Sequence, residues 1–107
     1  MRRGDIVAVA APGDFGKPRP AVIIQSDNFS QSDTVIVALL TSTLTDAPLL
    51  RVPVAPTTGN GLQFPSQIMA DKVMTLRRSR IGQHIGHLDD ETMVALNRTL
   101  ALVLGFA

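Results

Sequence analysis

Three sets of polar side chains adjoin apolar runs of the chain and are candidates for chemistry. Arg19 stands between two prolines, directly before the apolar run 21–25. The prolines fix φ on both sides of it, and the second one biases the backbone of Arg19 to an extended form. Hydroxyl side chains at 41–43 follow the apolar run 35–40, and Asp71 interrupts a later apolar segment. Spacing alone does not show that these groups converge, so a surface arginine, a turn and a surface carboxylate remain the alternatives.

A guanidinium is a planar, permanently charged fork that pairs with two oxygens of a phosphate or a carboxylate. An arginine held by neighbouring prolines at the entrance of a strand therefore suits the binding of an anion. The basic cluster Arg77, Arg78 and Arg80 is interpreted first as a solvated turn. Its alternative role is to attract phosphates at the edge of an RNA groove.

Histidine is the residue most often used for acid–base chemistry, but the spacing of His84 and His87 argues against a shared site. In a strand, residues three apart point to opposite faces. No third metal ligand lies nearby in the sequence. We therefore expect solvated or structural histidines and no metal site.

The composition sets the frame in which these residues must be placed. The chain has 107 residues, enough for one compact domain over 1–107 with one modest core. Apolar residues make up 45% and charged residues 18%, which is typical of a globular protein. The absence of cysteine excludes disulfides and thiolate metal sites and fits a reducing compartment. We find neither a secretory signal nor an apolar run that would span a bilayer, and a net charge of +1 allows nucleic acid only on a small patch.

Short runs rich in β-branched residues predict most of the chain to be β-structure. Strands are expected at 6–10, 21–25, 35–40 and 67–75, with a turn at Asn60-Gly61. The run 51–54 contains a proline and is expected at a sheet edge or a bulge.

The C-terminal segment predicts a helix that packs on this sheet. Asp89 can cap its start, and Gly105 is a plausible stop. The core stripe is formed by Met93, Leu96, Leu100 and Val103. The pattern predicts a small, curved, mainly β fold of mostly antiparallel strands with a C-terminal helix. The almost wholly apolar end, 101–107, is a candidate partner surface.

Several segments in a fixed order resemble the MazF/PemK family of bacterial toxins. They are "RRGDIV" at 2–7, "KPRPAVIIQSD" at 17–27, "LLTST" at 39–43, "NGLQFPSQIMADKVMTL" at 60–76 and "IGHLDDETM" at 85–93. The resemblance covers nearly the whole chain and implies an SH3-like barrel of five or more mostly antiparallel strands. It also implies the toxin of a type II toxin–antitoxin system, an endoribonuclease that cleaves single-stranded RNA, chiefly mRNA, at specific sequences without a metal or cofactor.

The resemblance further implies a mechanism and partners. The 2′-hydroxyl of the RNA attacks the phosphorus, which leaves 2′,3′-cyclic phosphate and 5′-hydroxyl ends. The protein is expected to be a cytoplasmic homodimer, neutralised by an antitoxin whose disordered segment folds onto the surface used by RNA. The first loop, between the strands at 6–10 and 21–25, helps to choose the RNA; here it is short and lacks the histidine that some members carry.

Carried over residue by residue, Arg19 matches the arginine before proline that is implicated in catalysis, and Thr41 matches a threonine that works with it. Asp71 matches an acidic position that is catalytic in some members, and proton abstraction is the task open to it. Because a guanidinium is permanently charged and a poor base, Arg19 is expected to stabilise charge instead. Met69 stands where some members have a second catalytic arginine. The residues expected to contact RNA are Lys17, Ser42, Gln67, Arg77 and Arg78.

Two other functions on the same fold are considered. CcdB-like gyrase poisons end in a tail that contains tryptophan, whereas this chain ends in "LVLGFA" and has no tryptophan. An SH3-like adaptor would need an aromatic groove, and an aromatic content of 4% without Trp or Tyr does not supply one. The sequence therefore favours the endoribonuclease.

Overall fold

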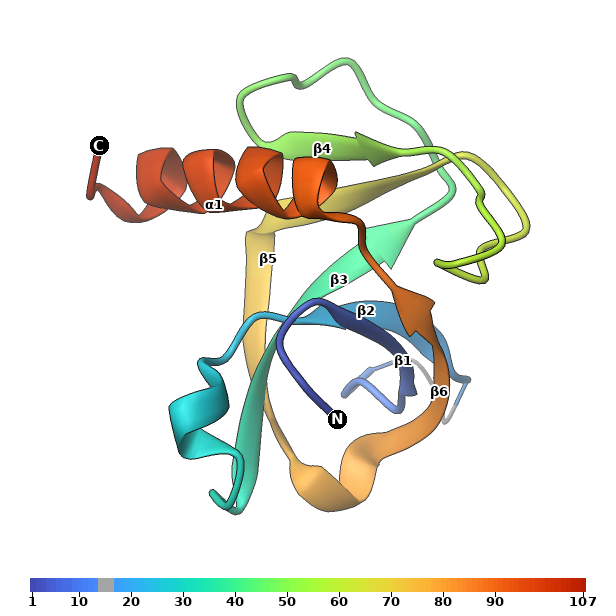
Figure 1. The fold of residues 1–107 in the computed structure, drawn as a ribbon, viewed down its shortest axis with the longest axis vertical. Coiled ribbons are helices and arrows are strands. Elements are labelled where there is room, and N and C mark those ends of the chain that lie inside the picture. The colour runs from blue at the N-terminus through green and yellow to red at the C-terminus, as the bar shows by residue number, and fades with distance from the viewer. Residues whose placement is uncertain (14–16) are drawn as a thin grey trace.

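The computed structural model describes residues 1–13 and 17–107, and its main feature is one antiparallel sheet that packs against one helix (Figure 1). In the described residues the strand order is β4-β5-β3-β2-β1-β6, and each neighbouring pair is antiparallel. The strands are β1 Asp5–Val9, β2 Arg19–Ile23, β3 Thr34–Thr41, β4 Arg51–Val54, β5 Ser66–Arg77 and β6 Ile81–His87. The helix is α1 Asp90–Leu104, and two 3-10 turns are η1 Asp27–Phe29 and η2 Arg78–Arg80. The predicted mainly β fold with a C-terminal helix is confirmed.

The helix forms as its end signals predict. The Asp89 carboxylate accepts a hydrogen bond from the backbone N–H of Thr92 at 2.8 Å, and Gly105 ends the helix with φ of 86°. Leu96 and Leu100 are buried in the apolar cluster between α1 and the sheet, and Met93 and Val103 pack against that cluster. Through this stripe α1 packs on β4 and β5. None of the helices among the described residues is long and apolar enough to cross a membrane.

The long strand β5 is interrupted, and this lets it pair with two neighbours in different places. Val73 pairs with Ala38 of β3, but Ile68 pairs with Leu40, so the register shifts between these two pairs. The first part of β5 also pairs with β4, which lies at the sheet edge as its proline predicted. The stretch between the two registers contains Asp71 and Lys72, both exposed. The polar interruption in the sequence is therefore the point at which the ladder is irregular.

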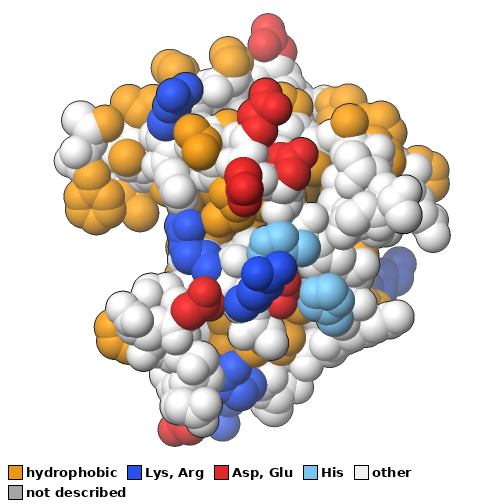
Figure 2. All heavy atoms as spheres, viewed as in Figure 1, with side chains coloured by type: hydrophobic (Ala, Val, Ile, Leu, Met, Phe, Trp, Pro, Cys, Tyr) orange, Lys and Arg blue, Asp and Glu red, His pale blue; other side chains and the backbone are white. Residues whose placement is uncertain are grey.

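The edge strand β6 is joined to β1 by a buried carboxylate. Asp5 is 5% exposed and pairs with His87 in the register of the two strands. Its Oδ1 lies 2.7 Å from Nδ1 of His87 and 3.5 Å from Nε2 of His84, and its Oδ2 accepts the backbone N–H of Arg2 at 2.9 Å. The two histidines lie side by side on this face in Figure 2 (pale blue), next to acidic and basic side chains.

The prediction that the two histidines point to opposite faces was wrong. Ile6 pairs with Gly86, but Val7 pairs with His84, so β6 has one extra residue at this point. Such a bulge reverses the alternation of side chains beyond it. His84 and His87 consequently approach the same carboxylate oxygen, although His84 stays 60% exposed in its side chain.

This contact makes stability depend on pH. Burial by itself would raise the pKa of the Asp5 carboxyl, but the hydrogen bond from the Arg2 backbone and the contacts with His87 and His84 outweigh it and hold the pKa below its usual value. The charged form is thus favoured in the folded state. Its contribution is present above the unfolded pKa of about 3.9 and is lost as the pH falls through the lower, folded pKa.

We expect Asp5→Asn to lower the free energy of unfolding at pH 7 by roughly 1–3 kcal/mol, because a charge-assisted contact is lost. Below about pH 4 the wild type should lose this advantage, so the two proteins should converge. Urea denaturation from pH 7 to pH 3 measures both effects. Asp46→Asn, a change at an exposed loop carboxylate, is the control. A gap between Asp5→Asn and wild type that is independent of pH would contradict the account.

Candidate active site

A groove of about 620 Å³ opens at the sheet end where β2 begins and β3 ends. We call it the Arg19 groove. One wall is the entrance to β2, residues 18–20, and another is the exit of β3, residues 40–43. A third wall is formed by residues 61–64 together with Ser66, and Ala8 and Ile85 complete the lining.

The groove exists where the ladder between β2 and β3 stops. Ile24 donates its backbone N–H to the Ile36 carbonyl at 3.1 Å, so the even-numbered residues of β2 direct their hydrogen bonds towards β3. The even-numbered residues before Ile24 are Val22 and Pro20, and Pro20 has no N–H to donate to β3. The pairing accordingly ends at Ala21 and Leu39. The residues just beyond this end line the groove.

The same register, continued beyond its last pair, would bring Arg19 to the level of Thr41. Ala21 pairs with Leu39, so continuing the antiparallel register by two residues places Arg19 opposite Thr41. Residues opposite one another on antiparallel strands lie on the same face of the sheet. The structure starts β2 at Arg19, two residues before the predicted start at 21, so the arginine belongs to the strand and also pairs with Val9 of β1. Arg19 is half-buried there.

The hydroxyl wall is fixed by short contacts. Oγ1 of Thr41 accepts the backbone N–H of Thr43 at 3.1 Å, which shapes the turn that carries Ser42. Farther along, the Gln67 amide bonds both the N–H and the carbonyl of Thr45, at 3.1 and 2.9 Å. Gln67 therefore ties the loop after β3 to β5.

The third wall is anchored by a buried asparagine. Asn60 is 4% exposed, and its Oδ1 accepts the backbone N–H groups of Thr57 and Leu62, both at 3.0 Å. Its Nδ2 donates to the Ala55 carbonyl at 2.8 Å. With the return bond from the Asn60 N–H to Thr57 Oγ1, Asn60 makes four hydrogen bonds around this turn.

The same turn sits tightly on β6. A Cβ at Gly61, whose φ is +68°, would lie 2.3 Å from the Ile85 carbonyl oxygen, and a Cβ at Gly86 would lie 2.3 Å from the Asn60 carbonyl. Only glycine permits this approach at both positions. The wall is therefore built on the sheet and is not a loosely attached loop.

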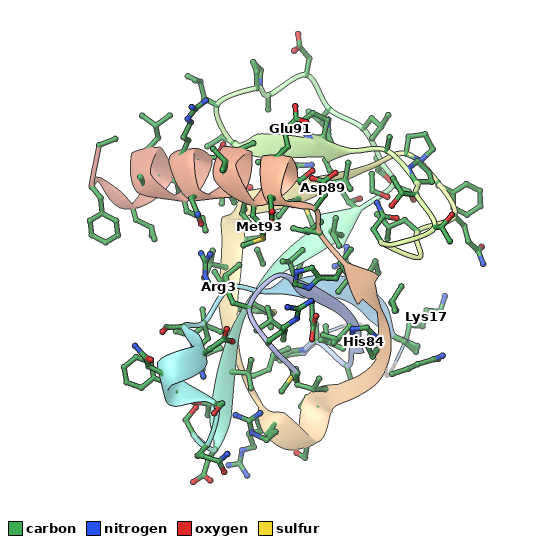
Figure 3. All side chains as sticks on the ribbon, viewed as in Figure 1. Arg3, Lys17, His84, Asp89, Glu91 and Met93 are labelled. Atoms are coloured by element: carbon green, nitrogen blue, oxygen red, sulfur yellow. The ribbon has the colours of Figure 1, made fainter. Side chains whose placement is uncertain are left out.

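The structure brings three of the predicted site residues together. Arg19, Thr41 and Ser42 all line the Arg19 groove. Lys17 is exposed beside the β2 entrance, and Figure 3 shows it reaching outward from the molecule. The first loop, expected to help choose the RNA, includes residues 14–16, which lie outside the described part of the chain.

Four other predicted site residues lie outside the described lining of the Arg19 groove, and the side chains of three of them contact other parts of the protein. Asp71 is not among the described residues that line the groove, and its Oδ1 lies 3.8 Å from Nε of Arg51. Arg78 donates twice to the Ser32 carbonyl, at 2.9 and 2.7 Å, and Arg77 pairs with Thr34. Thr34 begins the eight-residue strand β3 and the groove lies at its other end, roughly 23 Å away at the rise of a strand. Gln67 pairs with Thr41 in the sheet, but its side-chain amide is hydrogen-bonded to the backbone of Thr45 in the loop after β3.

Position 69 carries no second cation. Met69 is 4% exposed and belongs to an apolar cluster of the sheet. Its partner on β4 is Arg51, which is directed to Asp71 and to Gln67. Among the residues the structure describes, no three His, Cys, Asp or Glu side chains are placed to hold a metal ion.

Sequence reasoning missed the third wall. The sequence predicted a turn at Asn60-Gly61 but no role for the residues after it, and residues 61–64 line the groove together with the two strand ends. The signal available was Asn60-Gly61, whose turn directs the following residues back across the sheet. Nothing in the sequence alone says which strand end the segment then faces.

Comparisons with known proteins agree with this geometry. Residues 2–104 match the family described as "PemK-like, MazF-like toxin of type II toxin-antitoxin system". The chain belongs to this family. It is 46% identical to "Probable endoribonuclease MazF" of Mycolicibacterium smegmatis, over 100% of this chain and 99% of that protein. It is 32% identical to "Endoribonuclease MazF" of Staphylococcus saprophyticus, with 98% and 92% covered.

The fold of the family is also found among solved structures. An endoribonuclease in complex with its cognate antitoxin, from a mycobacterial species, superposes with a TM-score of 0.83 at 24% identity and covers 100% of this chain and 97% of that one. The predicted MazF/PemK resemblance and the predicted fold are therefore confirmed.

Proposed function

We propose that this chain is the toxin of a type II toxin–antitoxin pair, a sequence-specific endoribonuclease that cuts single-stranded RNA, chiefly mRNA, in the Arg19 groove. The observation that carries the proposal is that Arg19 and Thr41 line the same open groove of a MazF-like toxin fold. Relatives that match almost the whole chain are named endoribonucleases. Since its substrate is mRNA, the protein acts in the cytoplasm.

The reaction uses a nucleophile that RNA already carries. The 2′-oxygen attacks the adjacent phosphorus and loses its proton, and the bond from phosphorus to the 5′-oxygen of the next nucleotide breaks. The leaving 5′-oxygen takes up a proton, so the products are a 2′,3′-cyclic phosphate and a 5′-hydroxyl. The enzyme must splay the strand, align the attack and stabilise charge on the phosphorus. None of these tasks requires a metal or a cofactor.

Arg19 fits the stabilisation of charge. Its guanidinium can hold two oxygens of the pentavalent phosphorus, and its half-buried place on β2 limits its motion. Thr41 lines the same groove and can donate its hydroxyl to a phosphate oxygen while its Oγ1 accepts the N–H that shapes the following turn. Ser42 lies next to it in the groove and contacts the RNA.

The removal of the 2′ proton needs an acceptor that the described groove lining does not supply. The expected base, Asp71, lies outside the described lining and faces Arg51. This position favours a role in orienting Arg51. The described lining of the groove has no carboxylate or imidazole. We therefore assign most of the rate enhancement to alignment and to Arg19.

Arg19→Lys is expected to slow RNA cleavage almost as much as Arg19→Ala. Lysine keeps the charge but lacks the two-pronged fork, and loss of one stabiliser of developing charge lowers a rate on the order of a hundredfold or more. The measurement is the cleavage rate of a long RNA under single-turnover conditions. Arg98→Lys and Arg98→Ala, changes at an exposed arginine of α1, are the controls. Near wild-type cleavage by Arg19→Lys would show that Arg19 is a surface charge without a role in catalysis.

We further propose that the toxin is a homodimer and that its antitoxin competes with RNA. The C-terminal end of α1 exposes apolar side chains, which gather there in Figure 2 (orange): Leu102 is 55% exposed, Leu104 53% and Phe106 81%. Exposure of clustered apolar side chains to water is unfavourable in a monomer, so a partner surface is expected here. An acidic antitoxin segment would be drawn to the place where Arg19 receives phosphate.

Sedimentation velocity at micromolar concentration should show a dimer. An inhibition assay with the cognate antitoxin should show loss of RNA binding, and the inhibition should weaken at higher salt because charge attraction is screened. Leu104→Asp should shift the sedimentation towards monomer, whereas Arg98→Asp on the same helix should not. A monomeric wild type, or an antitoxin that binds while RNA affinity is unchanged, contradicts the scheme.

A further inference from the structure

The Arg19 groove contains an exposed phenyl ring that the mechanism above does not use. Phe64 lines the groove together with Arg19 and Thr41, and it is 63% exposed. It belongs to neither of the two apolar clusters of the core. Its ring therefore adds little to the stability of the fold and is open to a ligand.

The backbone that carries the ring is fixed on both sides. The Phe64 carbonyl accepts the hydroxyl of Ser66 at 2.8 Å, and Ser66 is 7% exposed and pairs with Val54 of β4. Before the ring, Asn60 anchors the turn to the sheet. A ring presented on a fixed backbone loses little freedom when a ligand binds.

The chain has few aromatic residues to offer an RNA base. It contains four phenylalanines and neither tryptophan nor tyrosine. Of the described ones, Phe29 and Phe106 line a different groove beside α1, and Phe64 lines the Arg19 groove. Among the described residues, the only aromatic surface next to Arg19 is thus Phe64.

We propose that Phe64 is a stacking platform for an unpaired base of the RNA next to the phosphate held by Arg19. The proposal rests on the proposed function and deepens it. Single-stranded RNA alternates phosphates with bases that have exposed π faces, and the groove offers an arginine and hydroxyls beside a phenyl ring. Stacking on the ring would splay the strand at the bond to be cut, which is the geometry that attack by the 2′-oxygen needs.

The test uses a spectroscopic signal that does not depend on cleavage. Because the chain has no tryptophan, Phe64→Trp introduces one fluorophore at the proposed platform. The probe is a pool of short single-stranded oligonucleotides of random sequence whose 2′-hydroxyls are methylated, so that they cannot be cut. We expect quenching by this pool and none by an abasic strand of equal length, which keeps the phosphates but has no bases. Phe29→Trp, at a ring that is 62% exposed in the other groove, should not be quenched by either.

The affinity of the full chain gives the second readout. Phe64→Ala should weaken binding of the pool by about 5- to 100-fold, the range for loss of one stacked base, and leave binding of the abasic strand unchanged. Phe29→Ala should change neither. Absence of quenching, equal quenching by the abasic strand, or unchanged affinity of Phe64→Ala would overturn the platform. Failure of the wild type to cleave unmodified RNA would instead overturn the proposed function.

Discussion

Pro20 has no backbone N–H, and because of this the ladder between β2 and β3 ends at Ala21 and Leu39, two residues before Arg19 and Thr41. A continued ladder would close the sheet end with backbone hydrogen bonds. Its interruption instead leaves an arginine and a run of hydroxyls at the mouth of a groove, on two strands whose relative position is fixed by the buried pairs behind them. The register of β2 and β3 thus fixes the relative positions of the site residues, and the absence of an N–H at Pro20 leaves the groove open.

The remaining walls depend on three polar side chains, of which Asn60 and Asp5 are buried and Gln67 is partly buried. Asn60 holds the third wall, Gln67 ties the loop after β3 to β5, and Asp5 fastens β6, on which the third wall rests, to β1. Each of these side chains bonds backbone groups or another polar side chain of a nearby segment. The groove is therefore preorganised, which is what stabilisation of a charged transition state by fixed groups requires.

Local signals in the sequence were sufficient for β1 to β5 and for the helix, but they predicted neither the strand β6 nor every side-chain position. The β-branched runs, the edge proline of β4, the cap at Asp89 and the stop at Gly105 predicted the strands and the helix, because each signal acts within a few residues. The site could be predicted only in part, and through resemblance: Arg19, Thr41 and Ser42 meet in the groove, whereas Asp71 does not. The facing of His84 could not be predicted, because register shifts such as those in β5 and β6 redirect side chains and a shift depends on the partner strand. Phe64 was missed because the path of a loop across a sheet is a property of the tertiary fold.

The most direct measurement of the central claim is the chemistry of the RNA ends. Purified protein is incubated with a long RNA in excess EDTA, the cleaved bonds are mapped, and the same RNA is then made with a 2′-deoxynucleotide at a mapped site. The account predicts that cleavage persists in EDTA, that the fragments carry 2′,3′-cyclic phosphate and 5′-hydroxyl ends, and that the deoxy-substituted bond resists. Loss of cleavage on chelation with rescue by a divalent ion, or 5′-phosphate ends, would contradict it.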